Sequence, residues 1–271
     1  ACSAAETGYV INLLFLILFI LSGWLLSKPF ISLYTDNAEL AQMAVTYLRI
    51  CLCLCPGVFM SVFCEKSIQS TGDTFHPMII QAAGAIFNIV MDPILIFGYL
   101  GFPSMGIAGA AYATVAGQFF SMLFGLVFLR RNAYLKVNLL KPAFSRRSAG
   151  DILKVGIPSI IMQGIGTIMT SLMNAILISY NVLATTVFGV YFKLQSFIFM
   201  PCFGLGSGLI AIVGYNFGAR IRERVYQAIR VALRYAVIIM AVGTLIFQLF
   251  PEFLMNVFDS SESVEAVEET S

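Results

Sequence analysis

Seven stretches of the chain are apolar over the roughly 20 residues that a helix needs to cross a bilayer. They cover residues 8–27, 41–63, 77–99, 105–129, 155–180, 184–209 and 229–250. Between Lys154 and Arg220 the only charged residue is Lys193, so this stretch is too long for one span and predicts two, joined by a tight turn near Tyr180–Asn181. The pattern predicts an all-α, polytopic membrane protein with seven transmembrane helices.

Composition supports a membrane protein and excludes a water-soluble one. Hydrophobic residues make up 59% of the 271 residues and charged residues only 11%.

The small residues from Gly106 to Gly117 predict a close helix–helix contact in the fourth span.

Basic residues gather in two segments that fix the expected orientation. Residues 130–154 and 220–234 hold 12 of the 16 Lys and Arg, and they follow the fourth and sixth spans. Both segments therefore fall on one side, which the positive-inside rule assigns to the cytoplasm. Asp36, Glu39 and the acidic residues from Glu252 to Glu269 fall on the other side. Short loops between spans explain these basic clusters, so we expect the lipid bilayer, and no nucleic acid, as a partner.

Asp92 is the first candidate functional residue, because it lies within the apolar run 77–99. A carboxylate at this depth costs free energy and usually serves to carry protons, ions or substrate. Asn88 shares its helix face four residues earlier, and Gln81 and Gly84 extend the stripe. Burial disfavours the charged form of a carboxyl group, so Asp92 can load and release a proton, and Asn88 can help to coordinate Na⁺. Pro93 lacks an N–H and is expected to bend the helix and free a carbonyl beside the carboxylate.

Gln81 and five further polar residues within the spans are candidates for lining a substrate cavity. Lys193 could line the cavity or tether a structural partner, and the two interpretations stay equal. Interhelical hydrogen bonding is the competing role for the amides. The five residues are Gln163, Asn174, Tyr191, Lys193 and Gln195.

A weak internal repeat indicates two bundles of helices. Shifted by 223 residues, Phe30, Asp36 and Glu39 coincide with Phe253, Asp259 and Glu262, each set after an apolar span. A parallel repeat of six spans is an arrangement found in secondary transporters, and it predicts 12 spans in a complete protein of which this chain is an internal fragment. We expect helices of an amino-terminal lobe in residues 1–130, a cytoplasmic basic linker in 131–147, and helices of a carboxy-terminal lobe in 148–271. A capping box, Ser148-Ala-Gly-Asp151, is predicted to open the fifth span.

Several stretches resemble the multidrug and toxic compound extrusion (MATE) family. They are Asn88–Gly98, Gly106–Thr114, Gly156–Ser159, Tyr191–Pro201 and Gly214–Arg220. The resemblance implies a protein of two six-helix bundles in which these seven spans are the third to ninth helices. It also implies a cation site at Asn88 and Asp92. Gly166 stands where one branch of the family has a Glu, which favours the DinF-like branch over a NorM-like one.

The resemblance implies a monomeric, multi-pass antiporter of the bacterial inner (plasma) membrane. Such a protein exports organic cations or amphipathic drugs by alternating access, coupled to H⁺ or Na⁺. It would not be an enzyme and would need no cofactor or bound metal other than the coupling ion. A lipid-linked oligosaccharide flippase of the same superfamily is the alternative, and a seven-helix receptor is a weaker one.

Overall fold

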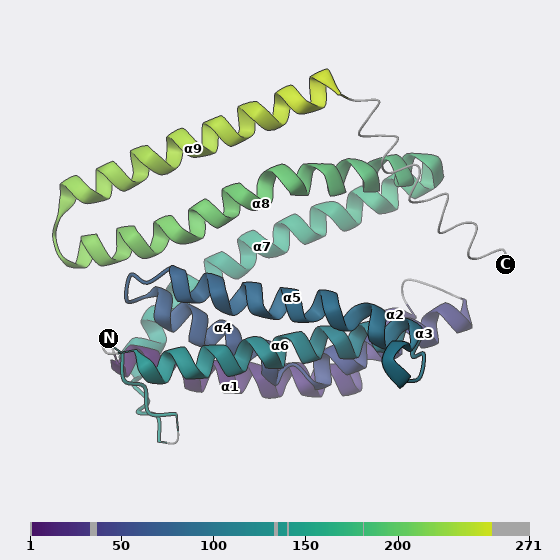
Figure 1. Ribbon diagram of the computed structural model, residues 1–271, viewed down its shortest axis with the longest axis horizontal. Helices are drawn as coiled ribbons and strands as arrows, with labels where there is room; N and C mark the ends of the chain where they lie inside the picture. Colours follow the sequence, from purple (N-terminus) through teal and green to yellow (C-terminus); the bar gives the residue numbers. More distant parts are fainter. Residues whose placement is uncertain (1, 33–36, 133–134, 140, 181, 251–271) are drawn as a thin grey trace. The chain divides into compact units, whose positions relative to one another are not determined.

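The computed structural model describes residues 2–32, 37–132, 135–139, 141–180 and 182–250, and gives only the backbone for 178–180, 182–187 and 190 (Figure 1). The described part is helical, with one short 3-10 turn at Tyr99–Gly101. Its helices are α1 (Cys2–Leu25), α2 (Ser27–Ile31), α3 (Ala38–Cys53), α4 (Pro56–Gln69), α5 (Phe75–Phe97), α6 (Gly106–Arg131), α7 (Arg146–Tyr180), α8 (Val182–Gly218) and α9 (Arg222–Leu249).

The predicted all-α, polytopic architecture is confirmed in the described residues. Six single helices are long and apolar enough to cross a membrane, and the bent pair α3–α4 makes a seventh candidate span. Their bounds differ from the hydropathy pattern, since α7 already begins at Arg146 and α8 continues to Gly218. The turn predicted at Tyr180–Asn181 and the repeat residues Asp36, Phe253, Asp259 and Glu262 include positions outside the described residues.

The second span is not the continuous helix 41–63 that the apolar run predicts. It bends by 47° between α3 and α4, and α4 continues to Gln69. Pro56 occupies the first turn of α4, where its missing N–H costs nothing. Because Pro56 has no N–H, the Leu52 carbonyl four residues earlier lacks its usual donor, and the backbone leaves helical geometry at Leu54, where α3 ends.

The capping box predicted at Ser148 is wrong. Helix α7 already begins at Arg146, and the Ser148 N–H donates to the Ser145 hydroxyl oxygen at 3.4 Å. Ser145 is therefore the residue that caps this helix.

At the start of α5, Asp73 provides the cap. Its Oδ1 accepts hydrogen bonds from the backbone N–H groups of Phe75 and His76 at 3.0 and 3.2 Å, and its Oδ2 lies 2.5 Å from His76 Nδ1. Partial burial alone would raise the pKa of Asp73, but the hydrogen bonds and the charge interaction with His76 outweigh it and lower the pKa. The other end of α5 closes on Gly98, which has the left-handed φ of 79° that glycine tolerates.

Two compact units make up the chain, residues 1–156 and 157–271. The first ten residues or so of α7 belong to the first unit and the rest to the second. The lobe boundaries predicted from the sequence, 1–130, 131–147 and 148–271, stay a prediction.

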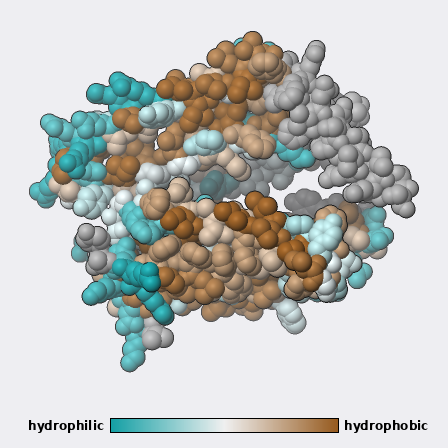
Figure 2. All heavy atoms as spheres, in the orientation of Figure 1, coloured by the Kyte–Doolittle hydropathy of each residue, from teal (hydrophilic) through white to brown (hydrophobic). Residues whose placement is uncertain are grey.

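Helix α6 is central to the first unit and contacts α3, α4 and α5. The close packing predicted for residues 106–117 is confirmed: Gly109 lies against the backbone of Leu95, and Gly117 against Gly84 and Asn88 of α5. Many large hydrophobic side chains of these helices are exposed, as expected of a lipid-facing surface. On the face shown in Figure 2, hydrophobic side chains cover the middle of this unit and hydrophilic ones gather at its linker end.

The linker between α6 and α7 is fastened to the first unit. Leu135 is buried in a cluster with Cys64, Ile68, Ile80 and Leu129.

Two residues at the start of α1 hold the linker backbone. The Glu6 carboxylate accepts hydrogen bonds from the backbone N–H groups of Asn138 and Ala143, both at 3.0 Å. The Thr7 hydroxyl oxygen accepts one from the Ser145 N–H at 3.1 Å. We call these three contacts the Glu6–Thr7 clasp.

In the second unit, α8 packs antiparallel to α9. Gly243 of α9 fits directly against the Ile198 side chain of α8, where a methyl group would clash.

Candidate functional site

The candidate site has two parts along α5. The outer part, farther from the start of the helix, is the pair Asn88 and Asp92. The Asn88 side-chain N–H donates to Asp92 Oδ1 at 3.4 Å, so the two side chains share one face as their spacing predicts. Both are half-buried. A hydrogen bond of this length is weak, and among the described residues it is the only one to the Asp92 carboxylate.

Helix α6 supports this pair by coming unusually close. A Cβ at Gly117 would lie 3.1 Å from Asn88 Cβ and 2.9 Å from the Gly84 carbonyl oxygen. The Asn88 backbone is therefore held by direct contact with α6, which fixes where its amide can point.

Pro93 leaves a third oxygen, the Ile89 carbonyl, free near the Asn88–Asp92 pair. It lies inside α5, where the helix continues to Phe97. Because proline has no N–H, the Ile89 carbonyl lacks its usual donor four residues later. The Asn88 amide oxygen, the Ile89 carbonyl and the Asp92 carboxylate thus lie within one turn, and hard cations prefer oxygen ligands of these kinds.

The inner part of the site joins α5 to α4. The Gln81 side-chain N–H donates to Glu65 Oε1 at 2.8 Å, and Lys66 Nζ lies 3.4 Å from the same oxygen. Glu65 is only 5% exposed, which makes it a buried carboxylate beside one ammonium group. Gln81 precedes Asn88 by seven residues, two helical turns, so the inner and outer parts lie along one stripe of α5.

The sequence pattern missed Glu65. It follows the apolar run 41–63 and stands next to Lys66, so it is indistinguishable from a surface ion pair at a helix end. The pattern also missed Asn12, a half-buried amide on α1 that donates to the Phe59 carbonyl at 2.8 Å. Asn12 is a polar residue within the predicted span 8–27, so the sequence did offer a signal for it, whereas it offered none for Glu65.

The other candidates lie on helices of the second unit. On α7, Gln163 is exposed and Asn174 half-buried, and on α8, Lys193 is exposed and Gln195 half-buried. Tyr191 is four residues before Gln195 and shares its face, whereas Lys193 points to a different side of the helix. Their proposed role in lining a cavity stays a prediction.

Comparison with known proteins identifies the family. The sequence pattern of the MatE family matches residues 1–94 and 158–270, most of the chain. The probable multidrug resistance protein NorM of Thermotoga maritima is 30% identical over 243 residues, which cover 88% of this chain and 52% of that protein. The FAD transporter of Shewanella oneidensis is 27% identical over 252 residues, covering 89% of this chain and 54% of that protein.

The fold agrees with that of a solved transporter. The MATE multidrug transporter DinF-BH superposes with a TM-score of 0.83 at 25% identity, over 96% of this chain and 58% of that one. The chain spans about half the length of the relatives it matches. It therefore belongs to the MATE family, whose members are membrane transporters and not enzymes.

Proposed function

We propose that this chain carries the cation-handling helices of an antiporter that exports organic cations or amphipathic drugs by alternating access. The observation that carries the proposal is the half-buried Asn88–Asp92 pair on a membrane-spanning helix, packed at Asn88 against Gly117 of α6. A polar pair at this depth is costly unless it is used, and a carboxylate can hold either a proton or a cation. The multidrug transporters among the relatives support the substrate class.

Coupling follows from competition at one carboxylate. The weak contact with Asn88 leaves Asp92 able to bind a proton or, with the Asn88 and Ile89 oxygens, Na⁺. Either ion neutralises the charge that attracts a cationic substrate. Binding of the ion from outside would then release substrate outward, and loss of the ion inside would restore the negative charge.

Replacing Asp92 by Asn tests the proposal, because it removes the charge and keeps the shape. In sealed vesicles containing the complete transporter, we expect D92N to abolish gradient-driven efflux of a cationic dye while membrane insertion stays normal. The matched control is D151N, the same change at an exposed carboxylate near the start of α7, and it should transport as the wild type does. Full efflux by D92N would refute the role of Asp92.

The coupling ion is tested in the same vesicles. A pH gradient without sodium and a sodium gradient at constant pH are imposed in turn. A proton-coupled protein responds only to the first and a sodium-coupled protein only to the second. We propose that either response is lost in D92N, since both ions use the same carboxylate.

A lipid-linked oligosaccharide flippase would need cationic groups to hold a pyrophosphate. The polar stripe of α5 instead carries Asp92 and faces Glu65, so cation export is the better fit. Membership of the MATE family also argues against the receptor alternative. We place the protein in the bacterial plasma membrane and propose that it works as a monomer.

A further inference from the structure

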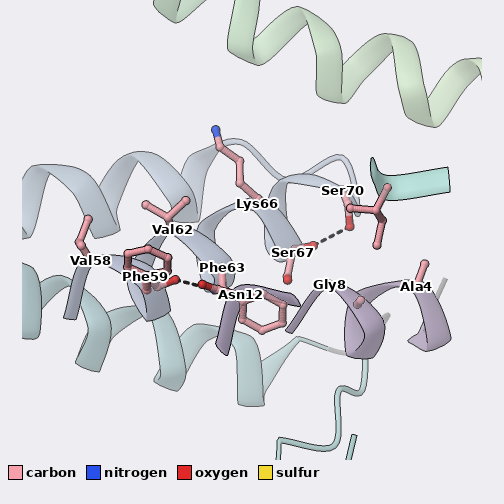
Figure 3. A pocket seen from close by; sticks show the side chains of 12 residues that line it. Ala4, Gly8, Asn12, Val58, Phe59, Val62, Phe63, Lys66, Ser67 and Ser70 are labelled. Atoms are coloured by element: carbon pink, nitrogen blue, oxygen red, sulfur yellow. Dashed lines mark hydrogen bonds between the residues drawn. The ribbon is translucent and has the colours of Figure 1, made fainter. Parts of the chain in front are cut away.

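A groove of about 710 Å³ runs between α1 and α4 in the first unit, apart from the polar stripe of α5. Its walls are α1 from Ala4 to Asn12 and α4 from Val58 to Ser70 (Figure 3), and Ile152 of α7 also lines it. We call it the α1–α4 groove. From it we propose that the protein binds an anionic phospholipid of the cytoplasmic leaflet, with one acyl chain in the groove and the phosphate at Lys66.

The groove has an apolar part and a polar end. Val58, Phe59, Val62 and Phe63 form the apolar part, and the Asn12 side-chain N–H there already donates to the Phe59 carbonyl. Figure 3 shows the hydroxyls of Ser67 and Ser70 at the end of α4, with the Lys66 ammonium extending from the same wall. An amphipathic ligand matches this division.

The length of the groove fits one leaflet. The 12 steps from Val58 to Ser70 rise about 18 Å along a helix. Half of a hydrocarbon core of about 30 Å is similar. The polar end adjoins the linker, which the basic residues assign to the cytoplasmic side. A lipid in the groove would therefore have its headgroup at the membrane surface and its chain parallel to the neighbouring chains.

Charge at the polar end favours an anionic headgroup. Lys66 is more than half exposed, although it also contacts Glu65 and Gln69. Arg146 and Arg147 begin α7 about 9 Å along the helix from Ile152. The Glu6–Thr7 clasp holds that helix start beside α1. The carboxylates at this end are engaged, Glu6 by two linker N–H groups and Glu65 by Gln81 and Lys66.

Tryptophan quenching tests the proposal in the complete transporter, reconstituted with every native tryptophan replaced by Phe. One tryptophan is introduced in the groove as Val62→Trp, and a control one on the exposed face of α5 as Ile86→Trp. The probes are phosphatidylglycerol and phosphatidylcholine with brominated acyl chains. At position 62 we expect half-maximal quenching at about fivefold less phosphatidylglycerol than phosphatidylcholine, as one basic group at a membrane surface predicts. At position 86 we expect no preference.

Two variants separate the headgroup from the chain. Lys66→Gln should reduce the preference at position 62 at least threefold. Gly8→Leu should abolish it by filling the groove, and it should still fold, because a Cβ at Gly8 meets only Ile152 Cδ1 at 3.9 Å. Equal quenching by both lipids, an equal preference at positions 62 and 86, or no quenching at position 62 because protein covers the groove would each overturn the proposal.

Discussion

Replacing Gly117 by Ala should destabilise the first unit and disturb the cation site together. The new methyl carbon would lie 3.1 Å from Asn88 Cβ and 2.9 Å from the Gly84 carbonyl oxygen. Carbon atoms prefer separations of about 3.5–4.0 Å, so α5 and α6 must part by about 0.4 Å or more. Overpacking of this kind costs about 1–3 kcal/mol. The unfolding equilibrium should therefore shift by about 5- to 150-fold.

The assay is a reversible denaturant titration of the protein in detergent micelles, with helix content as the signal. Gly150→Ala is the matched control, since no atom lies within 4 Å of its added methyl group and it is in the first turns of α7. Exchanging Gly for Ala there should be neutral or stabilising by up to about 1 kcal/mol. If Gly117→Ala were as stable as the wild type and pumped normally, the close contact of α5 with α6 would not be what positions Asn88.

Two further predictions concern polar contacts in the first unit. Glu65→Ala should cost about 1.5–3 kcal/mol of unfolding free energy, because it removes the hydrogen bond from Gln81 to the buried Glu65 carboxylate. Glu65→Gln keeps an acceptor oxygen and should retain most of the stability, and equal titration midpoints for the two variants would contradict this. Asp73→Ala should cost about 0.5–2 kcal/mol at neutral pH through the lost cap of α5. Because folding lowers the pKa of Asp73 below its ordinary value of 3.8, this stabilisation is present at neutral pH and is lost as the pH falls through the lowered value. Thermal unfolding at pH 7 and below pH 4 should show the difference between wild type and variant shrinking on acidification, and a constant difference would count against the charge.

Hydropathy was sufficient to predict the helical architecture, because a bilayer forces every spanning segment to satisfy its own backbone. The pairing of Asn88 with Asp92 was also predictable, since it depends only on helical spacing within α5. The break before Pro56 was missed because an apolar average is the same for a straight helix and a bent one.

Tertiary packing explains the remaining differences. Glu65 is buried because Gln81 on the next helix faces it, and no local pattern encodes a contact across 16 residues. Ser145 caps α7 in place of Ser148 because Thr7, far away in the sequence, fixes the backbone at Ser145.

The Glu6–Thr7 clasp makes the described part of the linker belong to the first unit. With Leu135 buried and the backbone of Asn138, Ala143 and Ser145 bound to α1, that segment is held in place and is no free tether. The chain therefore passes from one unit to the other inside α7, near Gly156. Pro158 follows within that helix and leaves the Lys154 carbonyl without its usual donor. The connection between the units is thus a helix with one backbone hydrogen bond missing, and not the loop that precedes it.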